Sequence, residues 1–162
     1  MKFVYVGKIV NTHGLKGELR ILSTFSHKEI VFIPGFSLYV NGKPYEISSI
    51  RKHKNYDMVT FKGYSDINDV LFFKGEDVYL NRTDLDSNII LDSDLVGFKM
   101  ISTTAKTGVI DSIVEGVKYS YFLISIGNKK YYVPKVDEFI EKIDIEERIV
   151  YIKEIEGLFD DN

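Results

Sequence analysis

The 162-residue sequence contains no cysteine and no tryptophan, only three prolines, and no long hydrophobic run. The absence of cysteine excludes disulfides, thiolate nucleophiles and zinc–thiolate sites, and it suits a reducing cytosol. The apolar runs are far shorter than a membrane-spanning helix, which needs about 20 apolar residues. The amino terminus is interrupted by Gly7 and Lys8 and has no signal-peptide cleavage pattern. We therefore expect a cytoplasmic protein that does not enter a membrane.

Aromatic and charged residues are plentiful. Eleven Tyr and eleven Phe give an aromatic content of 14%, which weakly favours β structure. The net charge of −3 conceals an uneven distribution: residues 1–62 hold ten Lys and Arg against four Asp and Glu, whereas residues 63–162 hold eleven against twenty. Either the first part binds an anionic surface and the second a basic one, or the charges are segregated by chance on two solvated surfaces.

Short alternating segments separated by turn dipeptides predict a small β-barrel in the first half of the chain. The predicted strands are residues 3–10, 18–23, 38–40, 45–50, 57–62 and 77–80. Asn41-Gly42 predicts a tight hairpin, because both residue types tolerate positive φ. One helix is predicted from a cap at Ser65 or Asp66 to Phe73.

A polar segment rich in turn-forming residues predicts a domain boundary. We expect a first domain over residues 1–84, a linker over 85–93 and a second domain over 94–162. In the second domain, strands are predicted at residues 97–102, 109–115, 121–126, 130–133 and 148–152. Gly127-Asn128 predicts another hairpin, and a helical turn is expected near residues 137–141. The predicted fold class is all-β, with two small β-barrels and one or two short helices.

The most distinctive stretch runs from Val6 to Arg20 and has the pattern strand, glycine-containing loop, strand. It lacks a Gly-x-Gly-x-x-Gly or Gly-Lys-Ser/Thr pattern and a following helix, which argues against a nucleotide-phosphate cradle. Gly14-Leu15-Lys16-Gly17 matches the G-x-x-G clamp of RNA-binding KH domains, but β-forming sequence lies on both sides, where that clamp needs helices. His13 and Glu18 are candidates for acid–base chemistry without a recognisable catalytic spacing.

Four motifs in matching order resemble the RimM family of ribosome maturation factors over about residues 4–160. His13-Gly14-Leu15-Lys16-Gly17-Glu18 is similar to the family's amino-terminal His-Gly-Leu-x-Gly-Glu signature. Asp94-Leu95-Val96-Gly97 is similar to the opening of its second domain. Two further stretches resemble its closing pattern and its carboxyl-terminal ending: Val133-Pro134-Lys135-Val136-Asp137-Glu138-Phe139-Ile140 and Glu156-Gly157-Leu158-Phe159-Asp160.

The resemblance implies a first barrel like those of translation factors and a second of the PRC-barrel type. It also implies a non-enzymatic, cytoplasmic protein without metal or cofactor, which we expect to be a monomer. Such a factor binds the immature small ribosomal subunit and its rRNA near the head and contacts small-subunit ribosomal protein number nineteen. It assists assembly and 16S rRNA processing. Ile90 and Leu91 stand where many family members carry an aromatic pair associated with subunit binding; pinning the linker to the second barrel is the other interpretation.

Two sets of contact residues follow as hypotheses. For rRNA we expect basic side chains of the first barrel: Lys8, His13, Lys16, Arg20, Arg51 and Lys52. For the ribosomal protein we expect residues of the linker and the second barrel: Ile90, Leu91, Tyr131, Tyr132, Lys135 and Glu138. Two other functions stay open. One is an RNA-modifying or hydrolytic enzyme that uses His13 and Glu18, and the other is a generic PRC-barrel interaction module.

Overall fold

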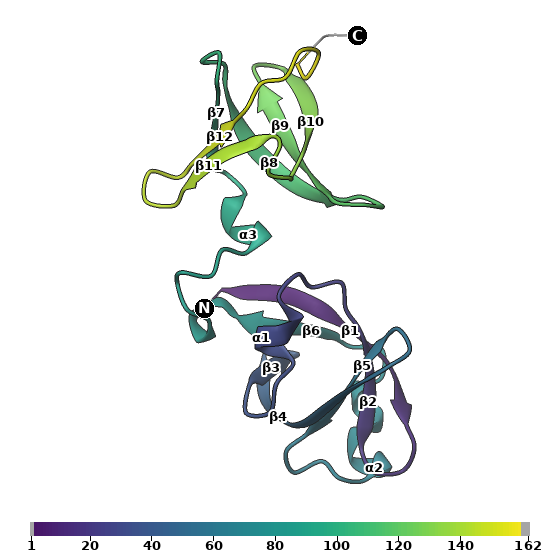
Figure 1. Cartoon of the computed structure of the whole chain (residues 1–162). Helices are drawn as coiled ribbons and strands as arrows, with labels where there is room; N and C mark the ends of the chain where they lie inside the picture. Colours follow the sequence, from purple (N-terminus) through teal and green to yellow (C-terminus); the bar gives the residue numbers. More distant parts are fainter. Residues whose placement is uncertain (1, 160–162) are drawn as a thin grey trace. The chain divides into compact units, whose positions relative to one another are not determined.

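The computed structural model describes residues 2–159, which are organised mainly in strands. The chain divides into two compact units, one that extends to Ile89 and one that starts at Ile90. The predicted all-β class is confirmed, because the helices in the described residues are single short turns (Figure 1). Asp160, the last residue of the carboxyl-terminal motif, lies outside the described residues.

The first unit is a closed barrel with the strand order β1-β2-β5-β4-β3-β6. Its strands are β1 (Phe3–His13), β2 (Glu18–Leu22), β3 (Ser37–Val40), β4 (Lys43–His53), β5 (Tyr56–Phe61) and β6 (Asp77–Asn81). All neighbouring strands are antiparallel. On β2, Leu19 and Ile21 are fully buried while Glu18 and Arg20 are not, so the alternation in the sequence separates the core from the outer face.

The β3–β4 hairpin has the turn that its sequence predicts. Asn41 and Gly42 have φ angles of 52° and 78°, and Val40 pairs with Lys43 on either side of them. Positive φ at both central residues is the geometry of a type I′ turn, whose twist matches that of the flanking strands. The local sequence therefore sets the register of this hairpin.

The helical elements of residues 2–159 are α1 (Lys28–Val31), α2 (Ile67–Val70), η1 (Leu71–Phe73), η2 (Arg82–Asp84) and α3 (Asp92–Leu95). The helix predicted to end at Phe73 is present, with Asp66 as its cap: the carboxylate accepts a hydrogen bond from the Asn68 amide at 2.8 Å. Its second half is a 3₁₀ turn, η1. The turns α1, η2 and α3 were not predicted. No helix in the described part of the chain is long and apolar enough to cross a membrane.

The η1 turn closes one end of the first barrel with aromatic rings. Phe73 is fully buried, and its ring centroid lies 4.8 Å from that of Tyr45 and 5.4 Å from that of Phe61. The neighbouring Phe72 points outward and is 55% exposed. Burial of such a ring contributes roughly 2 kcal/mol or more, which explains why a short, poorly hydrogen-bonded turn stays in place.

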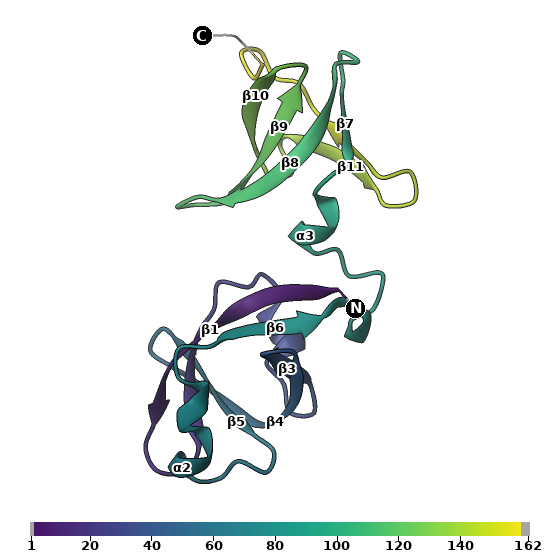
Figure 2. The same ribbon diagram turned by 180° about the vertical axis from the view of Figure 1, so that it is seen from behind.

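The second unit is a curled six-stranded sheet with the order β10-β9-β8-β7-β12-β11 (Figures 1 and 2). Its strands are β7 (Lys99–Ser102), β8 (Thr107–Glu115), β9 (Ser120–Ile126), β10 (Lys129–Pro134), β11 (Ile140–Asp144) and β12 (Ile149–Ile152). The β7–β12 pair is parallel and the other pairs are antiparallel. Buried Met100, Ile110, Phe122 and Val150 belong to one core on its inner face. The helical turn expected near residues 137–141 is a single turn, in which the Ile140 amide donates to the Val136 carbonyl at 3.1 Å. Strand β11, which follows directly from Ile140, was not predicted.

Candidate nucleic-acid interface

The glycine-containing loop between β1 and β2 is fixed against the start of α2. The Leu15 carbonyl accepts a hydrogen bond from the Ile67 amide at 2.9 Å. Gly17 has a φ of 83°, and a Cβ atom at this position would collide with the Tyr64 carbonyl oxygen. Only glycine combines this backbone conformation with so close an approach. The loop is therefore a rigid support for the residues on either side of it.

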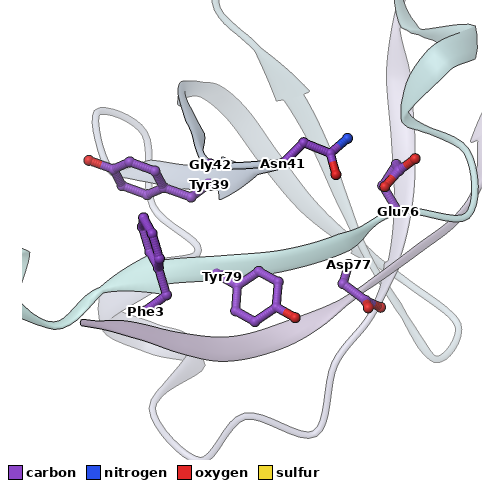
Figure 3. A pocket seen from close by; sticks show the side chains of 7 residues that line it. All are labelled: Phe3, Tyr39, Asn41, Gly42, Glu76, Asp77 and Tyr79. Carbon is purple, nitrogen blue, oxygen red and sulfur yellow. The ribbon is translucent and has the colours of Figure 1, made fainter. Parts of the chain in front are cut away.

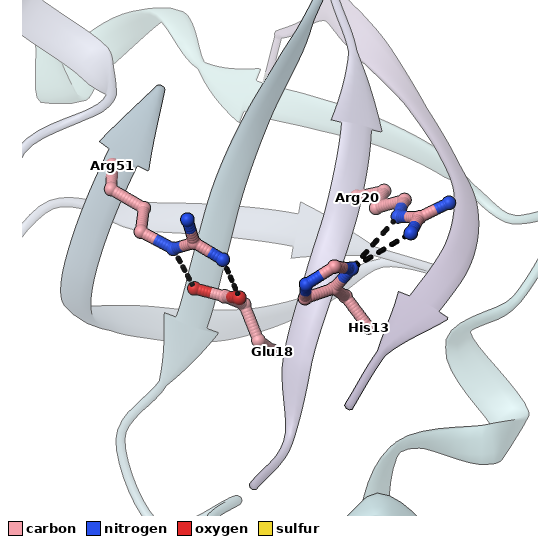
Figure 4. Close-up of polar contacts among 4 residues, drawn as sticks. All are labelled: His13, Glu18, Arg20 and Arg51. Carbon is pink, nitrogen blue, oxygen red and sulfur yellow. Dashed lines mark hydrogen bonds and ion pairs between the residues drawn. The ribbon is translucent and has the colours of Figure 1, made fainter. Parts of the chain in front are cut away.

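Glu18, directly after this loop, forms a two-point ion pair with Arg51. Arg51 donates from Nε to one carboxylate oxygen at 2.8 Å and from Nη2 to the other at 2.7 Å (Figure 4). These hydrogen bonds lower the pKa of Glu18 from its ordinary value and raise that of Arg51. The pair holds the Arg51 guanidinium in one orientation while the side chain stays 49% exposed.

Arg20 is held in a comparable way by His13. Its Nε and Nη2 atoms lie 3.2 and 2.8 Å from Nδ1 of His13, which is drawn in Figure 4. Because a guanidinium can only donate, Nδ1 is the acceptor and the proton of the neutral ring is assigned to Nε2. The guanidinium carbon also lies 5.8 Å from the ring centroid of Tyr56, within the range of a cation–π contact.

His53 is a member of this cluster that the sequence analysis missed. Its ring centroid lies 5.6 Å from that of His13, and it stands opposite Tyr56 in the β4–β5 register. Loss of hydration lowers the pKa of His53, and the cations Arg51 and Lys54 lower it further. The signal available in the sequence was its place beside a tight turn between two predicted strands. We call His13, Glu18, Arg20, Arg51 and His53 together the arginine face.

The other predicted rRNA-binding residues are placed differently. Lys16 lines an open hollow of about 580 Å³ with His13 and Glu18, so it borders the arginine face. Lys8 is exposed on β1 and stands opposite Asp77 of β6. Lys52 lies next to Arg51 in the chain and its Nζ lies 3.7 Å from Asp57, which is buried. Since neighbouring strand residues point to opposite sides, Lys52 and Arg51 do not share a face.

The chemistry of the arginine face is that of anion binding. The face holds two guanidiniums, that of Arg51 on the Glu18 carboxylate and that of Arg20 on the His13 ring, and each keeps N–H groups that its partner does not use. Arginine in a fixed orientation is well suited to phosphate oxygens, which accept two parallel hydrogen bonds. Glu18 is poorly suited to act as a general base with His13, because both its oxygens accept from Arg51 and its pKa is low.

The residues predicted to contact a protein all belong to the second unit, but they differ in how far they are exposed. Tyr131 packs against the core, whereas Tyr132 is 60% exposed, as expected for neighbours on one strand. Ile90 is 36% exposed and Leu91 is 1% exposed, so the Leu91 side chain contributes almost nothing to the accessible surface. Lys135 pairs with Asp92 at 3.0 Å, and Glu138 is exposed.

Comparison with known proteins adds two matching family models, which together extend over most of the chain. The model described as the RimM N-terminal domain matches residues 4–85, and that described as the RimM PRC barrel domain matches residues 92–158. A protein of an Exiguobacterium species named "Ribosome maturation factor RimM" is 34% identical over 170 residues, covering 99% of each chain. A protein of the same name from Staphylococcus aureus is 33% identical over 166 residues, covering 97% of this chain and 99% of its own.

Two solved structures are also similar. One is a crystal structure of a putative 16S ribosomal RNA processing protein RimM from Pseudomonas aeruginosa. It has 22% identity and a TM-score of 0.46, and the match covers 95% of this chain and 98% of that one. The other is a solution structure of the N-terminal domain of RimM from Thermus thermophilus. It has 23% identity and a TM-score of 0.45, and the match covers 53% of this chain and 96% of that one.

Proposed function

Because the chain belongs to the RimM family of ribosome maturation factors, we propose that it binds the immature small ribosomal subunit near its head. There it assists assembly and 16S rRNA processing in the cytoplasm without catalysing a reaction. A protein that binds one arrangement of rRNA and protein more tightly than others shifts the population towards that arrangement by its differential affinity. Such a factor needs well-placed contacts and no reactive group.

The observation that carries this proposal is the arginine face. Arg20 and Arg51 are each held at two nitrogen atoms before any ligand arrives, so little side-chain entropy is lost when they bind phosphate. The face lies in the part of the sequence with an excess of basic residues. The arginine face is therefore the rRNA-binding surface in our proposal, with Lys16 at its border and Lys8 further along β1.

The second unit contacts small-subunit ribosomal protein number nineteen in this proposal. Residues 90–162 hold fourteen Asp and Glu against nine Lys and Arg, an acidic excess that complements a basic ribosomal protein and speeds encounter with it. Tyr132 is the candidate central contact, because it is exposed and its ring lies 6.4 Å from that of Tyr121. Exposed aromatic side chains of this kind dominate many protein interfaces.

Co-sedimentation with purified subunits tests the proposal. We expect the chain to sediment with immature or free small subunits but not with complete ribosomes, and to dissociate as salt is raised. Replacing Arg20 and Arg51 together by Ala should weaken binding about tenfold or more and reduce the salt dependence. The matched control replaces Lys43 and Lys74, two exposed lysines of the same barrel, by Ala and removes the same charge.

Three outcomes would contradict the proposal. Equal binding to immature subunits and complete ribosomes would indicate a generic interaction module. An equal loss of affinity in the lysine control would show that only net charge matters. A Glu18→Gln variant that binds subunits normally but leaves rRNA with aberrant ends would favour the alternative function, an RNA-processing enzyme that uses His13 and Glu18.

A further inference from the structure

A second hollow on the first barrel has a different composition from the arginine face. Its volume is about 230 Å³, and it lies on the outer side of β1, β3 and β6 (Figure 3). Three aromatic residues, Phe3, Tyr39 and Tyr79, line it together with two acidic ones, Glu76 and Asp77. Asn41 and Gly42 of the β3–β4 turn complete the lining.

The hollow results from the way the barrel closes. β3 and β6 pair in register at one position, Tyr39 opposite Tyr79. Beyond this pair the β3–β4 turn and the start of β6 continue without further pairing, and the lining side chains surround the space left open (Figure 3). Since both strands are fixed elsewhere by their other neighbours, the opening is a permanent part of the barrel.

The aromatic side chains are partly exposed and support one another. The ring of Phe3 lies 5.1 Å from that of Tyr39 and 6.5 Å from that of Tyr79, in tilted or edge-to-face arrangements. Phe3 itself is 41% exposed. An exposed cluster of rings held in this way presents π-electron faces at little entropic cost.

The carboxylates give the hollow its charge. Neither Glu76 nor Asp77 takes part in an ion pair with a cation among residues 2–159, although Lys8 stands opposite Asp77 in the β1–β6 register. The charge of Asp77 also contributes to raising the pKa of the neighbouring Tyr5, after the larger effect of burial. Aromatic faces beside free carboxylates attract a cation and repel phosphate.

We propose that this hollow binds an arginine side chain of a basic protein segment. The planar guanidinium stacks on the rings and donates hydrogen bonds to Asp77 or Glu76. A nucleic-acid base could stack on the same rings, but its phosphates would meet two carboxylates, so RNA is the less suitable occupant. The inference goes beyond the proposed function, because it assigns a protein-binding site to the first barrel, and its test needs no ribosome.

The test uses a short blocked peptide with one arginine and a matched peptide with citrulline, which keeps the shape and loses the charge. In an NMR titration of the full chain, the arginine peptide should shift the backbone amides of Tyr39, Asp77 and Tyr79, with a dissociation constant on the order of 1 mM. The citrulline peptide should bind at least about fivefold more weakly. Asp77→Asn and Phe3→Ala should each weaken arginine binding by about threefold or more.

Asp69→Asn is the control variant, because it removes the same charge from an exposed position of the same barrel and should leave peptide binding unchanged. Amide spectra of the variants should match that of the wild type away from the hollow, which shows that the barrel is intact. Equal shifts with both peptides, or none with the arginine peptide, would overturn the proposal. Larger shifts of the same amides with uridine monophosphate than with the arginine peptide would also overturn it, in favour of a base-stacking site.

Discussion

Arg51 of β4 reaches across β5 to bind Glu18 of β2, 33 residues away in the sequence. Beneath this pair lies Met58 of β5, which stands opposite Arg20 on one side and Arg51 on the other. Met58 is fully buried although it belongs to the outward-facing row of the strands. The polar side chains of the arginine face therefore also cover an apolar residue, and their aliphatic stems contribute to the packing of the barrel.

Replacing Glu18 by Gln should make the stability of the first barrel less sensitive to acid. The hydrogen bonds from Arg51 lower the pKa of Glu18, so the folded protein binds this proton less tightly than the unfolded chain does. The contribution of Glu18 is therefore present above its unfolded pKa of about 4.3 and is lost as the pH falls through the folded pKa.

The measurement is urea unfolding of the wild type and Glu18→Gln across the acid range. The stability difference at neutral pH should shrink as the pH falls through the folded pKa of Glu18. Arg51→Ala is the matched variant, since removal of the donor should abolish the same pH dependence. A difference that stays constant over the whole range would show that the ion pair does not cause it.

Replacing Gly17 by Ala should destabilise the first barrel by at least about 2 kcal/mol, because the new Cβ adds a collision with the Tyr64 carbonyl to an unfavourable backbone conformation. Gly14 is the matched control in the same loop. It also has a positive φ, 69°, but a Cβ there meets nothing within 4 Å, so its replacement by Ala should cost only about 1–2 kcal/mol. Hydrogen exchange of the β1 and β5 amides measures the loss of stability in both variants. Equal losses would show that the loop does not pack against the Tyr64 backbone.

The His53 ring should report on the charge of the arginine face. Its folded pKa lies below the unfolded value, so this group disfavours folding as the pH falls below the unfolded pKa of about 6.5. Removing Arg51 by Ala takes away a cation and leaves Glu18 unpaired, and both changes should raise the pKa of His53. An NMR titration of the imidazole protons measures it, with His27 as an internal reference. Binding of a short RNA should also raise the pKa of His53, because phosphate charges would lie near the ring. A His53 pKa that is unchanged or lower with RNA bound would show that the phosphates bind elsewhere.

Replacing Phe122 by Ala should unfold the second unit selectively. This ring is fully buried in the core of residues 90–162, and such a truncation costs about 3–5 kcal/mol. We expect faster amide hydrogen exchange throughout that unit and unchanged exchange in residues 2–89, because each unit has its own core. The control is Tyr132→Ala, at an exposed site on the neighbouring strand, which should leave amide exchange in both units unchanged. Loss of protection in both units would show that they fold as one.

Strand β11 shows where pattern reading failed and why. Ile140 and Ile143 both pack against the core, but they are three residues apart, which is a helical spacing. The β11–β12 register shifts between Ile140 and Lys142, so one extra residue is inserted and the alternation of the strand is broken. A bulge of this kind changes the apparent period, and the sequence by itself gives no sign of where the partner strand lies.

The sequence by itself determined the local features of this protein. The Asn41-Gly42 turn, the helix cap and the alternation of β2 depend on interactions within a few residues. The sequence predicted the turn and the alternation, and it limited the cap to Ser65 or Asp66, of which the structure uses Asp66. The tertiary structure alone decided which charges meet. Glu18 binds Arg51 because β5 lies between β2 and β4 in the barrel. The aromatic hollow exists because β3 and β6 pair at only one position. Strand order and register arise from contacts between distant segments, and the period of a strand is the same whichever neighbour it has.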